Sequence, residues 1–253
     1  MESDGEPVTL AARDYDAVVF DMDGVITDTA TVHAAAWKRM FDDFLERRAA
    51  ETGSPFAPFR DEDYLRYLDG RPRDDGVEGF LASRGIHLDR GTANDAPVRE
   101  TIWGLANRKN REFLRTVETQ GVHAFPSSVA LVRDLHAHGL ATAVISASRN
   151  ARRILDAAGV ADLFSVRVDG IELEHLGLPG KPSPDMFIEA ARRLGVTPER
   201  SVVVEDAIAG VEAGRAGDFG FVVGVDRRGD GDDLRAHGAD VVVRDLDEVA
   251  VCA

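Results

Sequence analysis

Short runs of apolar, mostly β-branched residues recur along the chain, and each one ends in a polar or glycine-containing turn. The runs span residues 17–20, 140–145, 202–204, 221–223 and 241–243. Continuous apolar runs of this length are typical of strands that are buried on both faces of a parallel sheet. The pattern therefore predicts a strand at each of these positions.

Segments with helical patterning separate the later runs. They span residues 127–138, 149–158, 183–194 and 207–217. Short apolar strands that alternate with helices of about 10 to 15 residues indicate a parallel sheet covered by helices. We therefore expect an α/β fold with a doubly wound, Rossmann-like parallel sheet.

Residues 32–119 break this rhythm, because they carry helical patterning and many charges but no comparable apolar run. Two turn-rich connections, residues 51–58 and 89–97, lie inside this segment. The expected organisation is a core domain made of residues 1–31 and 120–253, with residues 32–119 inserted into it as a helical domain.

Charge and composition exclude several classes of partner. The formal net charge is -15, so neither nucleic acid nor an anionic membrane surface is an expected partner. Residues 1–13 lack a basic and apolar leader, no stretch is long and apolar enough to span a membrane, and Cys252 is the only cysteine. We expect a cytoplasmic protein, a monomer, that acts on a small molecule.

Polar side chains follow the predicted strands at the edge where open α/β sheets bind ligands. Asp21 and Asp23 come directly after the first strand, with Gly24 next. A pair of carboxylates in such a turn can divide the work of phosphoryl transfer, one attacking phosphorus and the other moving a proton. Alone, the pair could equally be two solvated turn residues.

A second acidic pair, Glu205 and Asp206, follows another predicted strand. Mg²⁺ prefers oxygen ligands, usually one or two carboxylates together with water and substrate phosphate. Asp21, the carbonyl of Asp23 and Asp206 could hold the ion, with Glu205 as a ligand or an orienting group. The alternative is that Asp206 caps a helix that begins at Ala207.

Lys181 lies in the sequence Gly-Lys-Pro-Ser-Pro, where Pro182 favours an extended lysine and Ser183 and Pro184 resemble an N-cap and a first helical residue. An ammonium fixed in this way can neutralise phosphoryl oxygens and hold a carboxylate nucleophile ready. A lone loop lysine is more often a solvated charge. The neighbouring acidic motifs favour the catalytic interpretation.

Ser146 follows the strand at residues 140–145, and Ser148, Arg149 and Asn150 come soon after it. If a helix opens here, its free amides and positive end form an anion site. Ser146 would then bind the transferring phosphoryl group, while Arg149 and Asn150 would hold a second phosphate. The alternative is an ordinary serine cap with unremarkable first-turn residues.

Taken together and in this order, the four segments resemble the haloacid-dehalogenase-like superfamily of phosphotransferases, including the helical cap between the first and second motifs. The resemblance covers nearly the whole chain. It implies Asp21 as nucleophile, Asp23 as general acid and base, and Ser146 and Lys181 as phosphoryl ligands. It also implies a magnesium site formed by Asp21, Asp23, Glu205 and Asp206.

Residues 20–29 are similar to the first motif of one branch of that superfamily and residues 70–75 to its cap loop, with further matches at residues 107–110 and 146–150. Through these matches the chain resembles the β-phosphoglucomutases. Pro72 and Asp69 depart from the usual cap loop, and His33 could also be a packing residue. Arginine and lysine on a helical domain are usually solvated. The resemblance implies a substrate-binding set made of Thr29, His33, Trp37, Gly70, Arg73, Lys109, Ala147, Ser148, Arg149 and Asn150.

The implied reaction converts β-glucose 1-phosphate to glucose 6-phosphate, through a phosphorylated aspartate and a bisphosphate intermediate. The implied enzyme is therefore an Mg²⁺-dependent intramolecular phosphomutase with a sugar phosphate as substrate. One alternative is a sugar-phosphate phosphatase of the same superfamily, whose cap would admit water. Another is a binding or regulatory protein that keeps the fold without catalysis, although such a protein would not need this complete set of reactive groups.

Overall fold

The computed structural model describes residues 8–253. Residues 1–7 belong to the start that is predicted to lack a leader, and they lie outside the described residues. The chain divides into two compact units. One comprises the residues up to Asp28 together with His123–Ala253, and the other is Thr29–Val122. The first unit contains the strands and the second is helical.

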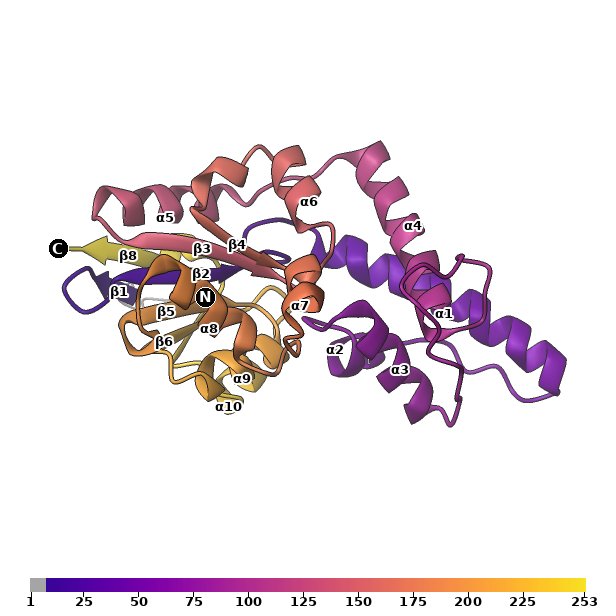
Figure 1. Ribbon diagram of the computed structural model, residues 1–253. Helices are drawn as coiled ribbons and strands as arrows, with labels where there is room; N and C mark the ends of the chain where they lie inside the picture. The colour runs from indigo at the N-terminus through magenta and orange to yellow at the C-terminus, as the bar shows by residue number, and fades with distance from the viewer. Residues whose placement is uncertain (1–7) are drawn as a thin grey trace. The chain divides into compact units, whose positions relative to one another are not determined.

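The first unit is built on a six-stranded parallel sheet with the order β4-β3-β2-β5-β6-β7 (Figure 1). This confirms the predicted α/β fold class. Val166–Asp169 was not predicted as a strand. The strands are β2 (Ala17–Asp21), β3 (Ala141–Ser146), β4 (Val166–Asp169), β5 (Ser201–Glu205), β6 (Phe221–Val225) and β7 (Val241–Val243).

Strand order places a topological switch point at β2. The chain leaves β2 for β3 and β4 on one side, then crosses back to β5, β6 and β7 on the other. Asp21 pairs with Ile145 of β3, and Phe20 pairs with Val204 of β5. The carboxyl ends of β2, β3 and β5 therefore meet at the position where open α/β sheets bind their ligands.

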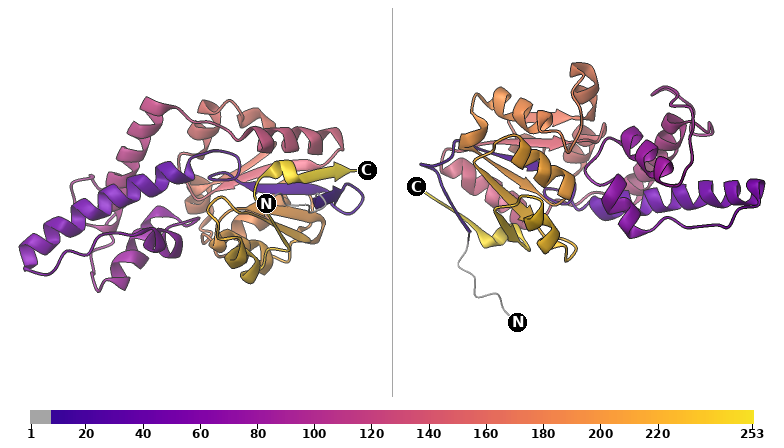
Figure 2. Two further views of the ribbon diagram at one scale, coloured as in Figure 1. Left: turned by 180° about the vertical axis from the view of Figure 1, so that it is seen from behind. Right: turned by 90° about the horizontal axis from the view of Figure 1, so that it is seen from below.

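Helices cover both faces of this sheet. In the views of Figures 1 and 2, α5 and α6 lie on one face, and α8, α9 and α10 lie on the other. All five residues of β2 and all five of β5 are buried, which explains their continuous apolar runs. The helices are α5 (Pro126–Ala137), α6 (Ala151–Ala157), α7 (Gly170–Leu176), α8 (Asp185–Leu194), α9 (Ile208–Ala216) and α10 (Gly231–Ala236), with 3₁₀ turns at Ala161–Leu163, Pro198–Arg200 and Leu246–Glu248.

A second, two-stranded sheet joins the two ends of the described chain. β1 (Val8–Ala11) pairs in parallel with β8 (Val249–Cys252), with Val8 opposite Val249. Neither strand was predicted from the sequence. Cys252 lies opposite Ala11 and is exposed.

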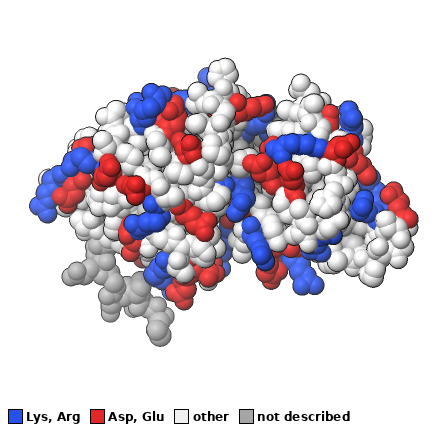
Figure 3. All heavy atoms as spheres, turned by 60° about the horizontal axis from the view of Figure 1, so that its bottom comes forward, with Lys and Arg blue, Asp and Glu red and all other residues white. Residues whose placement is uncertain are grey.

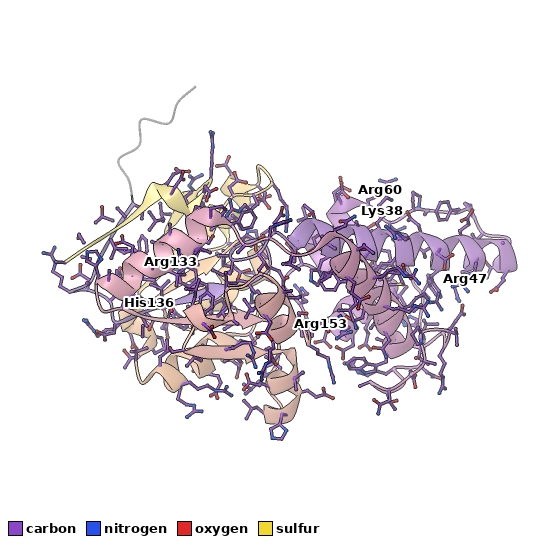
Figure 4. The ribbon with its side chains drawn as sticks, turned by 90° about the horizontal axis from the view of Figure 1, so that it is seen from above. Lys38, Arg47, Arg60, Arg133, His136 and Arg153 are labelled. Atoms are coloured by element: carbon purple, nitrogen blue, oxygen red, sulfur yellow. The ribbon has the colours of Figure 1, made fainter. Side chains whose placement is uncertain are left out.

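The second unit contains four helices: α1 (Ala30–Thr52), α2 (Asp61–Tyr67), α3 (Arg73–Ser83) and α4 (Ile102–Gln120). Its core combines aliphatic side chains with a cluster of aromatic rings. The ring of Phe41 lies 5.5 Å from that of Trp37, 5.1 Å from that of Phe59 and 4.4 Å from that of Phe80, measured between centroids. Lys38 on α1, labelled in Figure 4, donates to the Phe59 carbonyl at 2.9 Å and so ties the connection after α1 back to this helix.

Charged side chains of both signs are interspersed on the face shown in Figure 3. Acidic residues outnumber basic ones, 45 to 30. Among residues 8–253, no helix combines the length and the apolar character that a membrane crossing requires.

The aromatic core makes a first prediction. Phe41→Ala should lower the free energy of unfolding of the helical unit by about 3–5 kcal/mol, because it leaves a cavity among three rings. Both tryptophans, Trp37 and Trp103, belong to this unit, so urea unfolding followed by tryptophan fluorescence reports on it alone.

Phe56→Ala is the matched control, because Phe56 is 46% exposed. It should change the unfolding free energy by no more than about 0.5 kcal/mol. Equal effects of the two substitutions would contradict the packing described for Phe41.

Candidate active site

The buried ammonium of Lys181 joins two strand ends. Its Nζ donates to Oδ1 of Asp21, the last residue of β2, and to Oε2 of Glu205, the last residue of β5, at 2.9 Å for the second bond. The side chains of Lys181 and Glu205 are fully buried, and that of Asp21 is 8% exposed. A lysine from the loop before α8 thus bridges two carboxylates that the sheet already holds side by side.

The charges around Lys181 keep it protonated. Burial by itself would lower the pKa of this lysine, but the negative charges of Asp21 and Glu205 outweigh burial and raise the pKa above its usual range. Its side chain is fully buried, so no bulk water surrounds it, and its Nζ lies 5.4 Å from the centroid of the Phe187 ring. The group therefore acts as a fixed positive charge.

Asp206 completes a group of three buried carboxylates. One oxygen each from Asp21, Glu205 and Asp206 can be chosen so that all lie within 4.8 Å of one another. Burial, and next the charge of Glu205, raise the pKa of Asp21 well above its usual value, although Lys181 opposes this shift. Nη2 of Arg228 lies 3.4 Å from Oδ2 of Asp206. The cluster therefore interacts with positive charge beyond that of Lys181.

Two glycines leave room for these carboxylates. A Cβ on Gly24, whose φ is +91°, would lie 2.0 Å from Oδ2 of Asp206. A Cβ on Gly210 would lie 2.1 Å from Cδ of Glu205. Any side chain at either position would displace a carboxylate, so both acids are seated directly against backbone.

Asp23 is not one of the three clustered carboxylates, although its charge adds to the raised pKa of Asp21. Its Oδ2 accepts a hydrogen bond of 2.9 Å from Oγ of Ser146, the last residue of β3. The predicted metal ligand at this position is the backbone carbonyl of Asp23, which remains a prediction. The side chain of Asp23 is directed to the β3 side of the switch point, whereas Asp21 is bound on the β5 side by Lys181.

A helix does open after the loop that follows β3, although α6 begins at Ala151, two residues later than the predicted start at residue 149. Local side-chain bonds compete with helix formation here, because Oγ of Ser146 accepts from the Ser148 amide and Oγ of Ser148 accepts from the Asn150 amide, both at 3.1 Å. Arg149, predicted to hold a second phosphate, forms an ion pair with Glu174.

Ala147 lies against the start of α7. A Cβ on Gly170 would lie 2.4 Å from the Ala147 carbonyl oxygen, and the Gly170 amide donates to the Ser148 carbonyl at 3.2 Å. The loop is thus fixed by packing against backbone.

Two predicted helix caps are also corrected. Asp206 does not cap α9, because the N-cap residue is Ala207, whose amide donates to Oε1 of Glu205 at 3.2 Å. The N-cap of α8 is Pro184, one residue later than predicted, and Ser183 instead donates to the Asp185 carboxylate. The capping alternative for Asp206 is therefore wrong.

In the helical unit, three predicted substrate-binding residues lie together. Nζ of Lys109 on α4 is 2.6 Å from Nδ1 of His33 on α1, and 4.8 Å from the ring centroid of Trp37. Lys109 and Trp37 are each only 4% exposed. Packing thus accounts for much of what these residues do within this unit.

The other predicted residues of this unit lie at element starts. Thr29 is the buried N-cap residue of α1, although its side chain makes no capping bond. Gly70 has a φ of +70° in the turn before α3, and Arg73 is the first residue of α3. Their roles in substrate binding stay predictions.

Three residues that shape the site were not predicted from the sequence, because they belong to no acidic motif. They are Gly210, Arg227 and Arg228. The strand-end rule could have found both arginines, because they follow β6 as Asp23 follows β2. No local signal marks Gly210, whose importance comes from its distance to Glu205.

Comparison with known proteins places this geometry in a family. Residues 15–218 match the model of the haloacid dehalogenase-like hydrolases. A Mycobacterium bovis protein named β-phosphoglucomutase is 46% identical over 237 residues, which cover 92% of this chain and 90% of that protein. A Bacillus subtilis β-phosphoglucomutase is 33% identical over 236 residues, covering 93% and 92% of the two chains.

Solved structures agree with these sequence matches. The crystal structure of a β-phosphoglucomutase from Clostridium difficile superposes with a TM-score of 0.72 at 25% identity, and the match covers 92% of each chain. The family match extends over most of the chain and includes the strand ends that carry Asp21, Ser146 and Glu205. The chain therefore belongs to the haloacid dehalogenase-like hydrolase family.

Proposed function

We propose that this protein is an Mg²⁺-dependent β-phosphoglucomutase that interconverts β-glucose 1-phosphate and glucose 6-phosphate through phosphorylated Asp21. The observation that carries the proposal is the bridge from Lys181 to Asp21 and Glu205 at the switch point of the sheet. The relatives named β-phosphoglucomutase support the choice of reaction, since they match this chain along nearly its whole length.

The donor set fits Mg²⁺. Three buried carboxylates offer hard oxygen ligands, and their charge exceeds what one ammonium neutralises. Asp21, Asp206 and the carbonyl of Asp23 would hold the ion. We assign Glu205 to orientation, because it already accepts from Lys181 and from the Ala207 amide. When bound, Mg²⁺ would neutralise negative charge on the phosphoryl group.

Asp21 would attack phosphorus with a carboxylate oxygen, and the bond from phosphorus to the sugar oxygen would break. Lys181 holds Oδ1 of Asp21, so the nucleophile needs no reorientation before attack. Asp23 would give a proton to the leaving sugar oxygen, and in the return step it would take one from the attacking hydroxyl. The hydrogen bond from Ser146 holds Asp23 in place for both transfers.

A mutase must keep water from the aspartyl phosphate and hold the phosphate that is not reacting. We assign the first task to closure of the helical unit, which would act as a cap. Arg73, with its guanidinium suited to bidentate phosphate binding, is the proposed anchor in that unit. The loop that carries Ser148 and Asn150 is the proposed contact from the core.

Activity measurements test this proposal. With Mg²⁺ and a trace of the bisphosphate, the protein should convert β-glucose 1-phosphate to glucose 6-phosphate. Asp21→Asn should lower turnover by about 10⁴-fold or more, because it removes the nucleophile. Asp23→Asn should lower turnover by about 10²- to 10⁴-fold through loss of general acid and base catalysis.

Asp14→Asn serves as the control, since Asp14 is an exposed carboxylate just before β2 and should be dispensable. Release of inorganic phosphate in place of glucose 6-phosphate would identify a phosphatase. Full activity of Asp21→Asn would refute the assignment of the nucleophile.

Mg²⁺ should also stabilise the folded protein. At a concentration 100 times its dissociation constant, the ion should add about 2.7 kcal/mol to the unfolding free energy, because it binds the folded state selectively. Differential scanning calorimetry with and without a chelator measures the effect. Asp206→Asn should remove most of this stabilisation, whereas Asp14→Asn should retain it; an unchanged response in Asp206→Asn would exclude Asp206 as a ligand.

A further inference from the structure

Arg227 reaches from the loop after β6 to the loop that follows the proposed nucleophile. Its Nε donates to the Gly24 carbonyl at 3.0 Å, across 203 positions of the sequence. The side chain of Arg227 is only 16% exposed. This contact acts on the same Gly24 whose α-carbon faces the Asp206 carboxylate.

The guanidinium of Arg227 is itself held from two sides. Its Nη1 lies 3.2 Å from Oδ2 of Asp245, and its Cζ lies 4.0 Å from the centroid of the Phe125 ring. Asp245 also accepts a hydrogen bond from Ser127 at the start of α5. A flexible arginine would cost conformational entropy to fix, but this one is already confined by an ion pair and a ring.

Among residues 8–253, the other contacts hold the rest of the loop and not the Gly24 carbonyl oxygen. Ser128 Oγ donates to the Val25 carbonyl at 2.6 Å, and the Phe125 amide donates to the Ile26 carbonyl at 3.0 Å. The Gly24 amide donates to the Thr27 carbonyl at 2.8 Å. Arg227 therefore supplies the contact that fixes the Gly24 carbonyl and, with it, the tilt of this peptide.

The orientation of this peptide matters because little space separates the Gly24 α-carbon from the Asp206 carboxylate. A hydrogen on the Gly24 α-carbon is all that fits, since a Cβ would lie 2.0 Å from Oδ2 of Asp206. The Gly24 α-carbon also joins this peptide to the Asp23–Gly24 peptide, which carries the proposed backbone ligand, so a displacement of the α-carbon would move the Asp23 carbonyl as well. Two proposed ligands of the ion thus depend on one backbone segment.

We propose that Arg227 is a positioning residue, which fixes the Gly24 peptide and thereby sets the affinity of the carboxylate cluster for Mg²⁺. The inference rests on the proposed function only in taking Mg²⁺ as the ion of this site. Groups that orient metal ligands from behind typically change metal affinity by about 10- to 100-fold when they are removed.

Isothermal titration calorimetry of the full chain with Mg²⁺ tests this role without an activity assay. Arg227→Met should weaken Mg²⁺ binding by about 10-fold or more. In turnover, the loss should appear at low Mg²⁺ and be restored at saturating Mg²⁺, with KM for the sugar phosphate unchanged. A purely structural role would not move the Mg²⁺ affinity.

Arg215→Met is the matched control. Arg215 donates to the Gly238 carbonyl, at 3.1 Å from Nε and 2.8 Å from Nη2, and pairs with Asp240. Arg215 makes the same kinds of bond as Arg227. It lies at the end of α9, whereas the site is next to the start of that helix. Arg215→Met should leave Mg²⁺ affinity unchanged, even where thermal unfolding shows similar destabilisation.

Should Arg227→Met fail to fold, Asp245→Asn provides a second variant, because it releases Arg227 without removing it and should also weaken Mg²⁺ binding. Wild-type affinity in Arg227→Met or in Asp245→Asn, or equal weakening in Arg215→Met, would overturn the inference while leaving the mutase proposal intact. Wild-type protein that binds Mg²⁺ and makes no glucose 6-phosphate would overturn the mutase proposal alone.

Discussion

The site depends on one buried ammonium between two buried carboxylates. Removing one partner of such a buried pair typically costs about 3–5 kcal/mol, because the other charge is left uncompensated in a dry environment. Lys181 therefore stabilises the arrangement that it also orients, and the strand ends of β2 and β5 cannot separate without exposing Asp21 and Glu205. Stability of the core and readiness of the nucleophile have the same physical origin.

The sheet makes this interaction possible by its strand order. Because the chain reverses direction across the sheet at β2, three strand ends converge there, each followed by a loop of different chemistry. β5 contributes the two acids at its end, β3 contributes Ser146, and the loop before α8 contributes Lys181. The hydrogen bond from Ser146 holds the proposed proton carrier, Asp23, at the end of β3.

Much of this could be predicted from the sequence, since buried β-branched runs mark strands and the residues after them share one edge of the sheet. The strands at Val8–Ala11 and Val249–Cys252 escaped prediction because they pair only with each other, from opposite ends of the chain. The late start of α6 follows from hydroxyl bonds at Ser146 and Ser148, which propensity does not reveal. The role of Gly210 depends on its distance to Glu205 across the fold and leaves no local pattern, whereas Arg227 follows a strand end but belongs to no acidic motif.

The central claim is that Asp21, held by Lys181, carries the phosphoryl group during turnover. Rapid quenching after addition of the bisphosphate, reduction of any acyl phosphate with borohydride and peptide mapping by mass spectrometry identify the carrier directly. The account predicts conversion of Asp21 to homoserine, with Asp23, Glu205 and Asp206 unchanged. Modification of another residue, or none under conditions of full turnover, would contradict it.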